Sequence, residues 1–183
     1  MRSRGLKGSR RALSLVVSSL ILLVSSALLA SGTIAYYAFT TTSAAMRQEQ
    51  LLIIEAHVWV NASGSQAALT LENIGGGDAL IEYIEVKYSR VPWERVYHAS
   101  SGDGELTPVQ RLNISEPFTH MIGGASITFE RASGPLAIES GEGATIYLEG
   151  PFDIQVSDVG KIILIVIHTA ATQYPALVNA EFA

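Results

Sequence analysis

A run of 35 residues without a charged side chain, from Ala12 to Met46, constrains this chain more than any other feature. As a helix rising ~1.5 Å per residue it would extend about 50 Å, against a bilayer hydrocarbon core of ~30 Å. A secretory signal has an apolar region of only about 7–15 residues. The run is therefore too long for a simple export signal and longer than one membrane span requires. We expect one near-continuous helix over residues 13–48, ending in the polar stretch "TTTSAAMRQEQ".

Charge is distributed unevenly around this run. The leader, residues 1–12, carries five basic side chains and no acidic one, whereas residues 13–183 carry 7 basic and 17 acidic side chains, a net charge of −10. A basic flank stays in the cytoplasm, which directs the C-terminus outside. The acidic body argues against nucleic acid as a partner. The chain has no cysteine, so disulfides, thiolate metal sites and thiol catalysis are not available to it.

Small residues recur along the apolar run at heptad spacing, and they include Ser14, Ser18, Ser25 and Gly32. On a membrane helix, a stripe of small residues lets other helices approach closely, which would make it a helix-packing surface. Alternatively, serine is merely tolerated in a single-span anchor because its hydroxyl bonds the backbone one turn back. Taken alone, the stripe favours the second interpretation.

The stretch "SRRALSLVVSSLILLVSSALLASGTIAYY" resembles the class III signal peptide and N-terminal helix of archaeal type IV pilins, in the form common among crenarchaeal members. In that family a membrane peptidase removes the basic leader, and the retained helix packs with its copies into a filament core. An outward-facing immunoglobulin-like β domain follows. The fifth residue after the expected cut is Val17, where bacterial pilins have glutamate, and this points to the archaeal branch.

Two cleavage positions fit the family pattern, after Gly8 or after Ala12. A cut after Gly8 would leave Arg10 and Arg11 on a helix destined for an apolar core, where an unpaired charge costs several kcal/mol. A cut between Ala12 and Leu13 leaves a helix start without charged side chains. We therefore predict leader residues 1–12, a membrane or filament-core helix over 13–48, and a β domain over 49–183.

After residue 50 the apolar pattern changes to a period of two, which is typical of half-buried antiparallel strands. In "LLIIEAHVWV" we expect an inward face of Leu52, Ile54, Ala56, Val58 and Val60. In the last run we expect Val178, Ala180 and Phe182 to face inward. Further strands are expected at 66–72, 125–131, 144–149 and 161–169, the last of them central because it is apolar on both faces. About eight short strands between glycine-rich turns predict a β-sandwich, and thus an α+β chain.

Short passages such as "TLENIGGGDALIEYIEV" and "GEGATIYLEG" resemble strand-turn-strand segments of archaeal immunoglobulin-like filament domains. The motif "GGGD" at 75–78 lacks the lysine and helix of a phosphate loop, and "GDGE" at 102–105 lacks the spacing of a calcium loop. The four histidines are scattered, and no nucleophile motif occurs. We expect no enzymatic activity, no cofactor, no bound metal and no small-molecule substrate. Asn61 and Asn113 begin sequons and are candidate glycosylation sites of an exported domain.

The sequence therefore indicates a structural subunit of a type IV pilus-like surface filament, an adhesion pilin. Its expected partners are other copies of the chain in a helical filament, the membrane before assembly, the prepilin peptidase and the assembly machinery. The precursor would lie in the membrane and the mature chain in an extracellular filament. Alternatives are an archaellin, a β-sandwich accessory protein held by one uncleaved helix, and an exported protein cut near residues 30–32.

Overall fold

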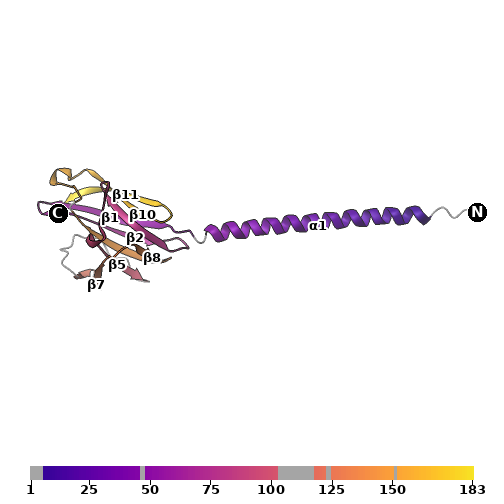
Figure 1. Ribbon diagram of the computed structural model, residues 1–183, viewed down its shortest axis with the longest axis horizontal. Helices are drawn as coiled ribbons and strands as arrows, with labels where there is room; N and C mark the ends of the chain where they lie inside the picture. The colour runs from indigo at the N-terminus through magenta and orange to yellow at the C-terminus, as the bar shows by residue number, and fades with distance from the viewer. Residues whose placement is uncertain (1–5, 46–47, 103–117, 123–124, 151) are drawn as a thin grey trace, which may run out of the picture. The chain divides into compact units, whose positions relative to one another are not determined.

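The computed structural model describes residues 6–45, 48–102, 118–122, 125–150 and 152–183, and the chain divides into two units, residues 1–45 and 46–183. The first unit is a single helix, α1 (Leu6–Ala45), of 40 residues (Figure 1). The helix is continuous through Gly32 and through the threonines at 40–42. This confirms a long apolar N-terminal helix. Residues 6–12 of the expected leader are helical as well, so the expected leader–helix boundary lies inside α1.

The described part of the second unit consists of strands, their connecting loops and two 3-10 turns, η1 (Trp93–Arg95) and η2 (Val156–Asp158). The strands are β1 (Leu51–Asn61), β2 (Gly64–Asn73), β3 (Ala79–Val86), β4 (Ser89–Arg90), β5 (Val96–Gly102), β6 (Phe118–Ile122), β7 (Ala125–Arg131), β8 (Leu136–Ile138), β9 (Gly143–Glu149), β10 (Ile162–Thr169) and β11 (Gln173–Phe182). All of the runs with period-two or two-faced apolar patterns form strands, and β10 is flanked by β3 and β11 as expected for a central strand.

The strands form one curled sheet in the order β4-β3-β10-β11-β1-β2-β9-β5-β7-β6, with β8 beside β3. Every pairing is antiparallel except the short parallel contact of β1 with β11. Figure 1 shows the sheet curling on itself. Strands from separate parts of it share one core: Leu69 of β2 and Ile146 of β9 belong to the same buried cluster as Ile84 of β3 and Ile165 of β10. The chain is thus α+β, with a mostly antiparallel sheet.

The predicted inward face of β1 is wrong over its first half. Leu52 is 46% exposed and Ile54 is 50% exposed, whereas Leu51 is buried and Ile53 packs against the core. The register of β1 with β2 shifts between Ile53 and Glu55, which marks a β-bulge. One extra residue reverses the alternation, so the even positions face the core only after the bulge.

The expectation for Phe182 is also wrong, because its side chain is 68% exposed. Pairing of β11 with β10 ends at Asn179, so Phe182 lies beyond the last residue that β10 covers. Val178 and Ala180 are buried, as predicted. Within the described strands, β2 and β9 are buried on both faces, because a second cluster of Trp59, Ala68, Tyr97, Phe129 and Tyr147 covers the face away from the main core.

Candidate functional site: an apolar helix and the clamp that follows it

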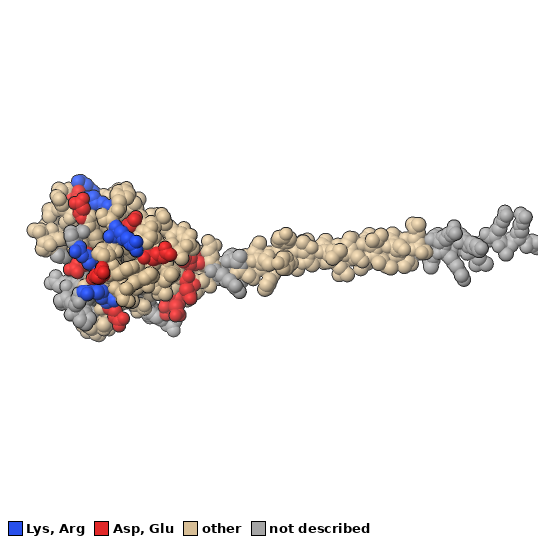
Figure 2. All heavy atoms as spheres, in the orientation of Figure 1, with Lys and Arg blue, Asp and Glu red and all other residues tan. Residues whose placement is uncertain are grey.

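The surface of α1 is the largest unpartnered feature of the described chain. The most apolar 18 residues within 14–43 have a mean hydropathy of 2.2, and no residue of that stretch is buried, so the helix is long and apolar enough to cross a membrane. Leu22 is 71% exposed and Phe39 is 73% exposed. Figure 2 shows this part of the helix without a charged side chain. By this criterion alone, a signal sequence near the N-terminus would qualify as well, so this helix indicates a membrane anchor or a signal sequence.

Seven of the described hydroxyl groups along α1 bond to the helix's own backbone. Ser18 donates to the Ser14 carbonyl at 2.9 Å, and Thr33 donates to the Leu29 carbonyl at 2.8 Å. Ser19, Ser26, Ser31, Thr40 and Thr41 make the same kind of bond three or four residues back. A hydroxyl left without a partner in an apolar medium costs several kcal/mol. These polar residues therefore do not prevent α1 from lying in lipid or among other apolar helices.

Four sequence-predicted packing residues lie on one side of α1. At about 100° per residue, Ser14, Ser18, Ser25 and Gly32 fall within about 40° of one another around the helix axis. A Cβ added at Gly32 would meet nothing within 4 Å. The helix thus offers a shallow stripe where another helix can approach closely.

The predicted cleavage residues Arg10, Arg11, Ala12 and Leu13 lie in the first turns of α1. The backbone is helical on both sides of the expected cut. The cleavage position remains a sequence-based prediction.

A hydrogen-bonded clamp, residues 73–77, holds the segment through which the chain enters the β unit, residues 48–50. The Ile74 N–H donates to the Gln50 carbonyl at 2.9 Å, and the Gly76 N–H donates to the Gln48 carbonyl at 3.1 Å. The Gln50 N–H donates to Asn73 Oδ1 at 3.3 Å. The clamp therefore fixes the backbone of the three residues that precede β1.

Asn73 organises this clamp from a fully buried position. Its Oδ1 also accepts from the Gly75 N–H at 3.1 Å, and its Nδ2 donates to the carbonyls of Gly77 at 2.9 Å and Ile138 at 3.0 Å. Ser140 Oγ donates to the Gly75 carbonyl at 2.6 Å. The loop 73–77 is thereby held in one conformation between residues 48–50 on one side and residues 138–140 on the other.

Gly75 and Glu49 complete the clamp. A Cβ at Gly75 would overlap the Gln50 nitrogen and the Gln48 carbonyl oxygen, so only glycine fits. Glu49 is buried, its carboxylate accepts from the Thr169 hydroxyl, and its carbonyl accepts from the Tyr174 hydroxyl at 3.5 Å. From the sequence alone, "GGGD" at 75–78 indicated only a turn between strands. The run of glycines after a strand-ending asparagine was the one available signal that another backbone approaches closely.

The Asn61 sequon lies in the β1–β2 turn, at the opposite end of β1 from the clamp. The side-chain oxygen of Asn61 accepts from the Ser63 N–H at 2.9 Å and from the Ser63 hydroxyl at 2.7 Å. Asn61 is half-buried and Ser63 is exposed, which leaves the turn open to solvent. Asn113, the second candidate, lies outside the described residues.

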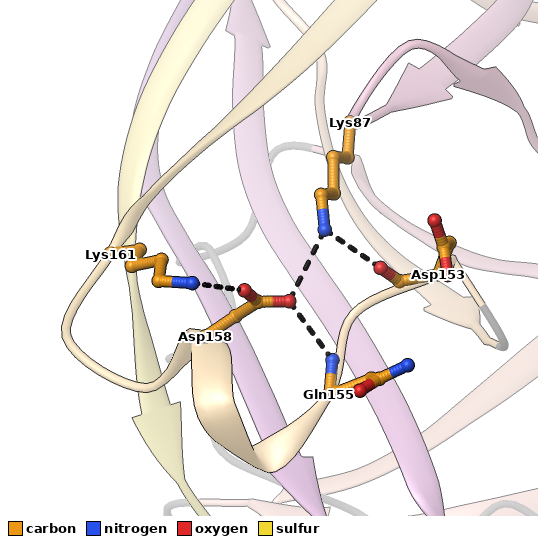
Figure 3. A network of polar contacts seen from close by, with 5 residues as sticks. All are labelled: Lys87, Asp153, Gln155, Asp158 and Lys161. Atoms are coloured by element: carbon orange, nitrogen blue, oxygen red, sulfur yellow. Dashed lines mark hydrogen bonds and ion pairs between the residues drawn. The ribbon is translucent and has the colours of Figure 1, made fainter.

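A charged network at that same far end joins the loop before β10 to the β3–β4 turn (Figure 3). Asp158 accepts from Lys161 Nζ at 2.8 Å, from the Gln155 N–H at 3.1 Å and from Lys87 Nζ at 3.2 Å. Lys87 also donates to the Asp153 carbonyl at 2.8 Å. The hydrogen bond from Lys161, then those from Gln155 and Lys87, hold the pKa of Asp158 well below its usual value. The arrangement leaves the carboxylate fully engaged in structural contacts.

The described histidines do not gather into a metal site. His57 lies between Glu55 and Glu181 at 3.1 and 3.3 Å, and His168 contacts Glu85 at 3.2 Å. Burial lowers the pKa of His98, an effect that Glu130 partly offsets. Among the residues described here, no group of three or more His, Asp or Glu side chains is placed to hold a metal ion.

Comparison with known proteins assigns this chain to no family, because no family model matches it and no curated protein matches it significantly.

Proposed function

We propose that this chain is the structural subunit of an archaeal type IV pilus-like surface filament. The observation that carries the proposal is α1: 40 continuous helical residues, with a 30-residue apolar stretch whose side chains are exposed. At ~1.5 Å per residue that stretch is about 45 Å long, against the ~30 Å of a bilayer core. A filament core imposes no such limit on the length of an apolar helix.

The mechanism is mechanical. The helix resides in the membrane until assembly and then exchanges lipid for helices of other copies. The stripe of Ser14, Ser18, Ser25 and Gly32 supports this exchange, because neighbouring backbones can approach along it. The clamp around residues 48–50 supports it too, since a subunit under tension must transmit force from helix to domain through this segment.

We further propose that the curled sheet belongs to the immunoglobulin-like sandwich type. Its strands are mostly antiparallel, and residues from its two ends enclose one core. In this proposal the acidic domain coats the filament exterior, serves adhesion, and carries glycan at Asn61, whose turn lies far from the clamp. The subunit has no catalytic role and needs no cofactor.

The deciding experiment is intact-mass measurement on filaments shed from cells that produce the chain. We expect a mature chain that begins at Leu13, with any additional mass assigned to glycan by removal of the sequon through Asn61→Gln. Ala12→Arg should leave uncleaved precursor in the membrane and abolish filaments, because the charge replaces the small residue before the cut. A membrane-bound chain that still begins at Met1, without filaments, would instead support an anchored accessory protein.

The packing stripe has its own test. Ser18→Leu and Ser25→Leu should each reduce the number of filaments strongly while membrane insertion continues, because leucine inserts well but separates helices that meet across small residues. Ser31→Leu is the matched control, since Ser31 lies about 100° around the helix from the stripe. Equal filament counts for all three variants would remove the role assigned to the stripe.

A further inference from the structure

The middle of the outward face of β10 and β11 is apolar, between His168 and Gln173 at one end and Asn179 at the other. In the register of these strands, Leu164 lies opposite Leu177 and Val166 lies opposite Pro175. Leu177 is 72% exposed, and Ile162 at the start of β10 is 66% exposed. Monomeric soluble proteins rarely expose contiguous apolar surface of this kind unless it binds something.

A groove extends this surface toward β1. The parallel pairing of β1 with β11 covers only residues 58–60 and 180–182, so the two strands separate before it. The groove between them has a volume of about 270 Å³ and is lined by residues 53–56 and 175–178. Ile54, turned outward by the bulge in β1, is 50% exposed along it. We call Ile54, Ile162, Leu164, Val166, Pro175 and Leu177 the apolar face.

We propose that the apolar face is the docking surface for helix α1 of a second copy of this chain, and that the occupant is the outer part of that helix, residues 34–43. The inference rests on the proposed filament function and names the partner surface within it. Three observations bear on this occupant: the length of α1, the charge of the two candidate partners, and the side of α1 on which its residues lie.

The length of α1 leaves a segment that lipid does not cover. The apolar stretch has 30 residues, whereas about 20 suffice to cross the hydrocarbon of a bilayer. Counted from Ser14, the last ten or so residues extend beyond the outer surface. Ile34, Tyr37 and Phe39 in this segment are 70%, 64% and 73% exposed. Residues 40–43 are threonines and a serine, so the part of this segment that an apolar partner would cover is 34–39.

Charge favours a helix over a second β domain as the occupant. Residues 46–183 carry a net charge of −10, so two such domains repel each other at close range. The segment 34–43 has no charged side chain and can cover the apolar face without burying an unpaired charge. The groove of about 270 Å³ can accept protruding side chains of such a helix.

The side of the helix separates two of these residues from the third, because Phe39 lies within about 20° of Ser14, on the stripe itself. Ile34 and Tyr37 lie about 140–200° around α1 from Ser14, away from the small-residue stripe. In a filament the stripe meets other helices, so this opposite side remains for a β domain. One helix can therefore contact helices and the apolar face of a neighbour at the same time.

Introduced cysteines test the contact directly, because the chain contains none of its own. Cells producing both Tyr37→Cys and Leu177→Cys chains should yield filaments in which mild oxidation forms a disulfide-linked dimer, necessarily between different copies. The matched control pairs Tyr37→Cys with Met121→Cys, whose side chain on β6 is 64% exposed. We expect at least tenfold less dimer from the control.

Three outcomes overturn the inference. Filaments without the 37–177 dimer would contradict the docking surface while leaving the proposed function intact. Dimers of Leu177→Cys alone at the level of the mixed pair would assign the apolar face to a second β domain. Unsubstituted chains that never form filaments would contradict the proposed function itself, and this inference with it.

A charge on the apolar face gives an independent readout. Leu177→Glu should reduce filament number at least tenfold, and Met121→Glu should leave it unchanged. Both side chains are largely exposed, so neither substitution opens the core, and the circular dichroism of both variants should match that of the unsubstituted chain. Normal filaments from Leu177→Glu would also overturn the proposal.

Discussion

Helix α1 and the β unit use the same apolar residue types in opposite ways. In α1, Leu22 and Leu29 are 71% and 74% exposed; in the β unit, Leu69 and Leu71 are fully buried. The helix makes its own backbone hydrogen bonds but buries none of its 14–43 stretch, whereas the β unit provides both hydrogen bonds and a core. A helix of this kind obtains its apolar surroundings from lipid or from other chains. The β unit is complete by itself.

Separating the two regions should give the largest effect. We expect residues 48–183 alone to fold in water with one cooperative thermal transition, because the described core lies entirely within this part of the chain. The full chain should require detergent to remain in solution, since α1 exposes a long apolar surface. Circular dichroism and sedimentation of both forms check this. If residues 48–183 do not fold without α1, the β unit depends on the helix for its stability, and the contrast between the two regions is wrong.

A pair of matched truncations to alanine sharpens the same contrast. Ile146→Ala removes a fully buried side chain at the centre of β9 and should lower the free energy of unfolding of the β unit by about 2–5 kcal/mol. Leu22→Ala removes a similar side chain from α1 and should leave that free energy unchanged. Urea unfolding in detergent, monitored by tryptophan fluorescence, measures both. Equal effects would mean that the helix contributes to the stability of the β unit.

The two regions also differ in how far their sequence predicts them. The helix follows from one continuous uncharged run, and the central position of β10 follows from apolar residues on both faces. The prediction of the inward face of β1 was wrong over its first half, because a bulge at Ile54 cannot be recognised from a period-two pattern. The exposure of Phe182 depends on where a neighbouring strand ends, which is a property of the tertiary fold.

The clamp and the apolar face illustrate the same limit at the candidate site. Residues 48–50 are distant in sequence from both the loop 73–77 and Thr169, and they meet these two parts of the chain only through the tertiary fold. The small-residue stripe was predictable, since four residues at helical spacing share a side of any continuous helix. Leu164 and Leu177 were predicted to be in strands, but their uncovered outward face required the structure.

Gly75→Ala tests whether the attachment segment belongs to the rigid part of the molecule. The added methyl group would overlap the backbone of Gln48 and Gln50, so the clamp must shift, at a cost of about 1–3 kcal/mol in the free energy of unfolding. Gly134→Ala is the control, because its Cβ would meet nothing within 4 Å and should change that free energy by less than about 0.5 kcal/mol. Faster hydrogen exchange of the Ile74 and Gly76 amides in Gly75→Ala would locate the loss at the clamp. Identical stability of the two variants would contradict the close approach.

The smallest expected effect concerns the charged network at the far end of the β unit. The pKa of Asp158 is lowered in the folded chain, first by the hydrogen bond from Lys161 and then by those from Gln155 and Lys87. Its stabilising contribution is therefore fully present above the unfolded pKa of about 3.9 and is lost as the pH falls below that value. Asp158→Asn should lower the melting temperature at pH 7, and the difference from the unsubstituted chain should shrink steadily between pH 5 and pH 2.5. Asp153→Asn is the control, because Lys87 bonds the Asp153 carbonyl and not its carboxylate. A difference between Asp158→Asn and the unsubstituted chain that stays constant over this pH range would show that the carboxylate does not act through its charge.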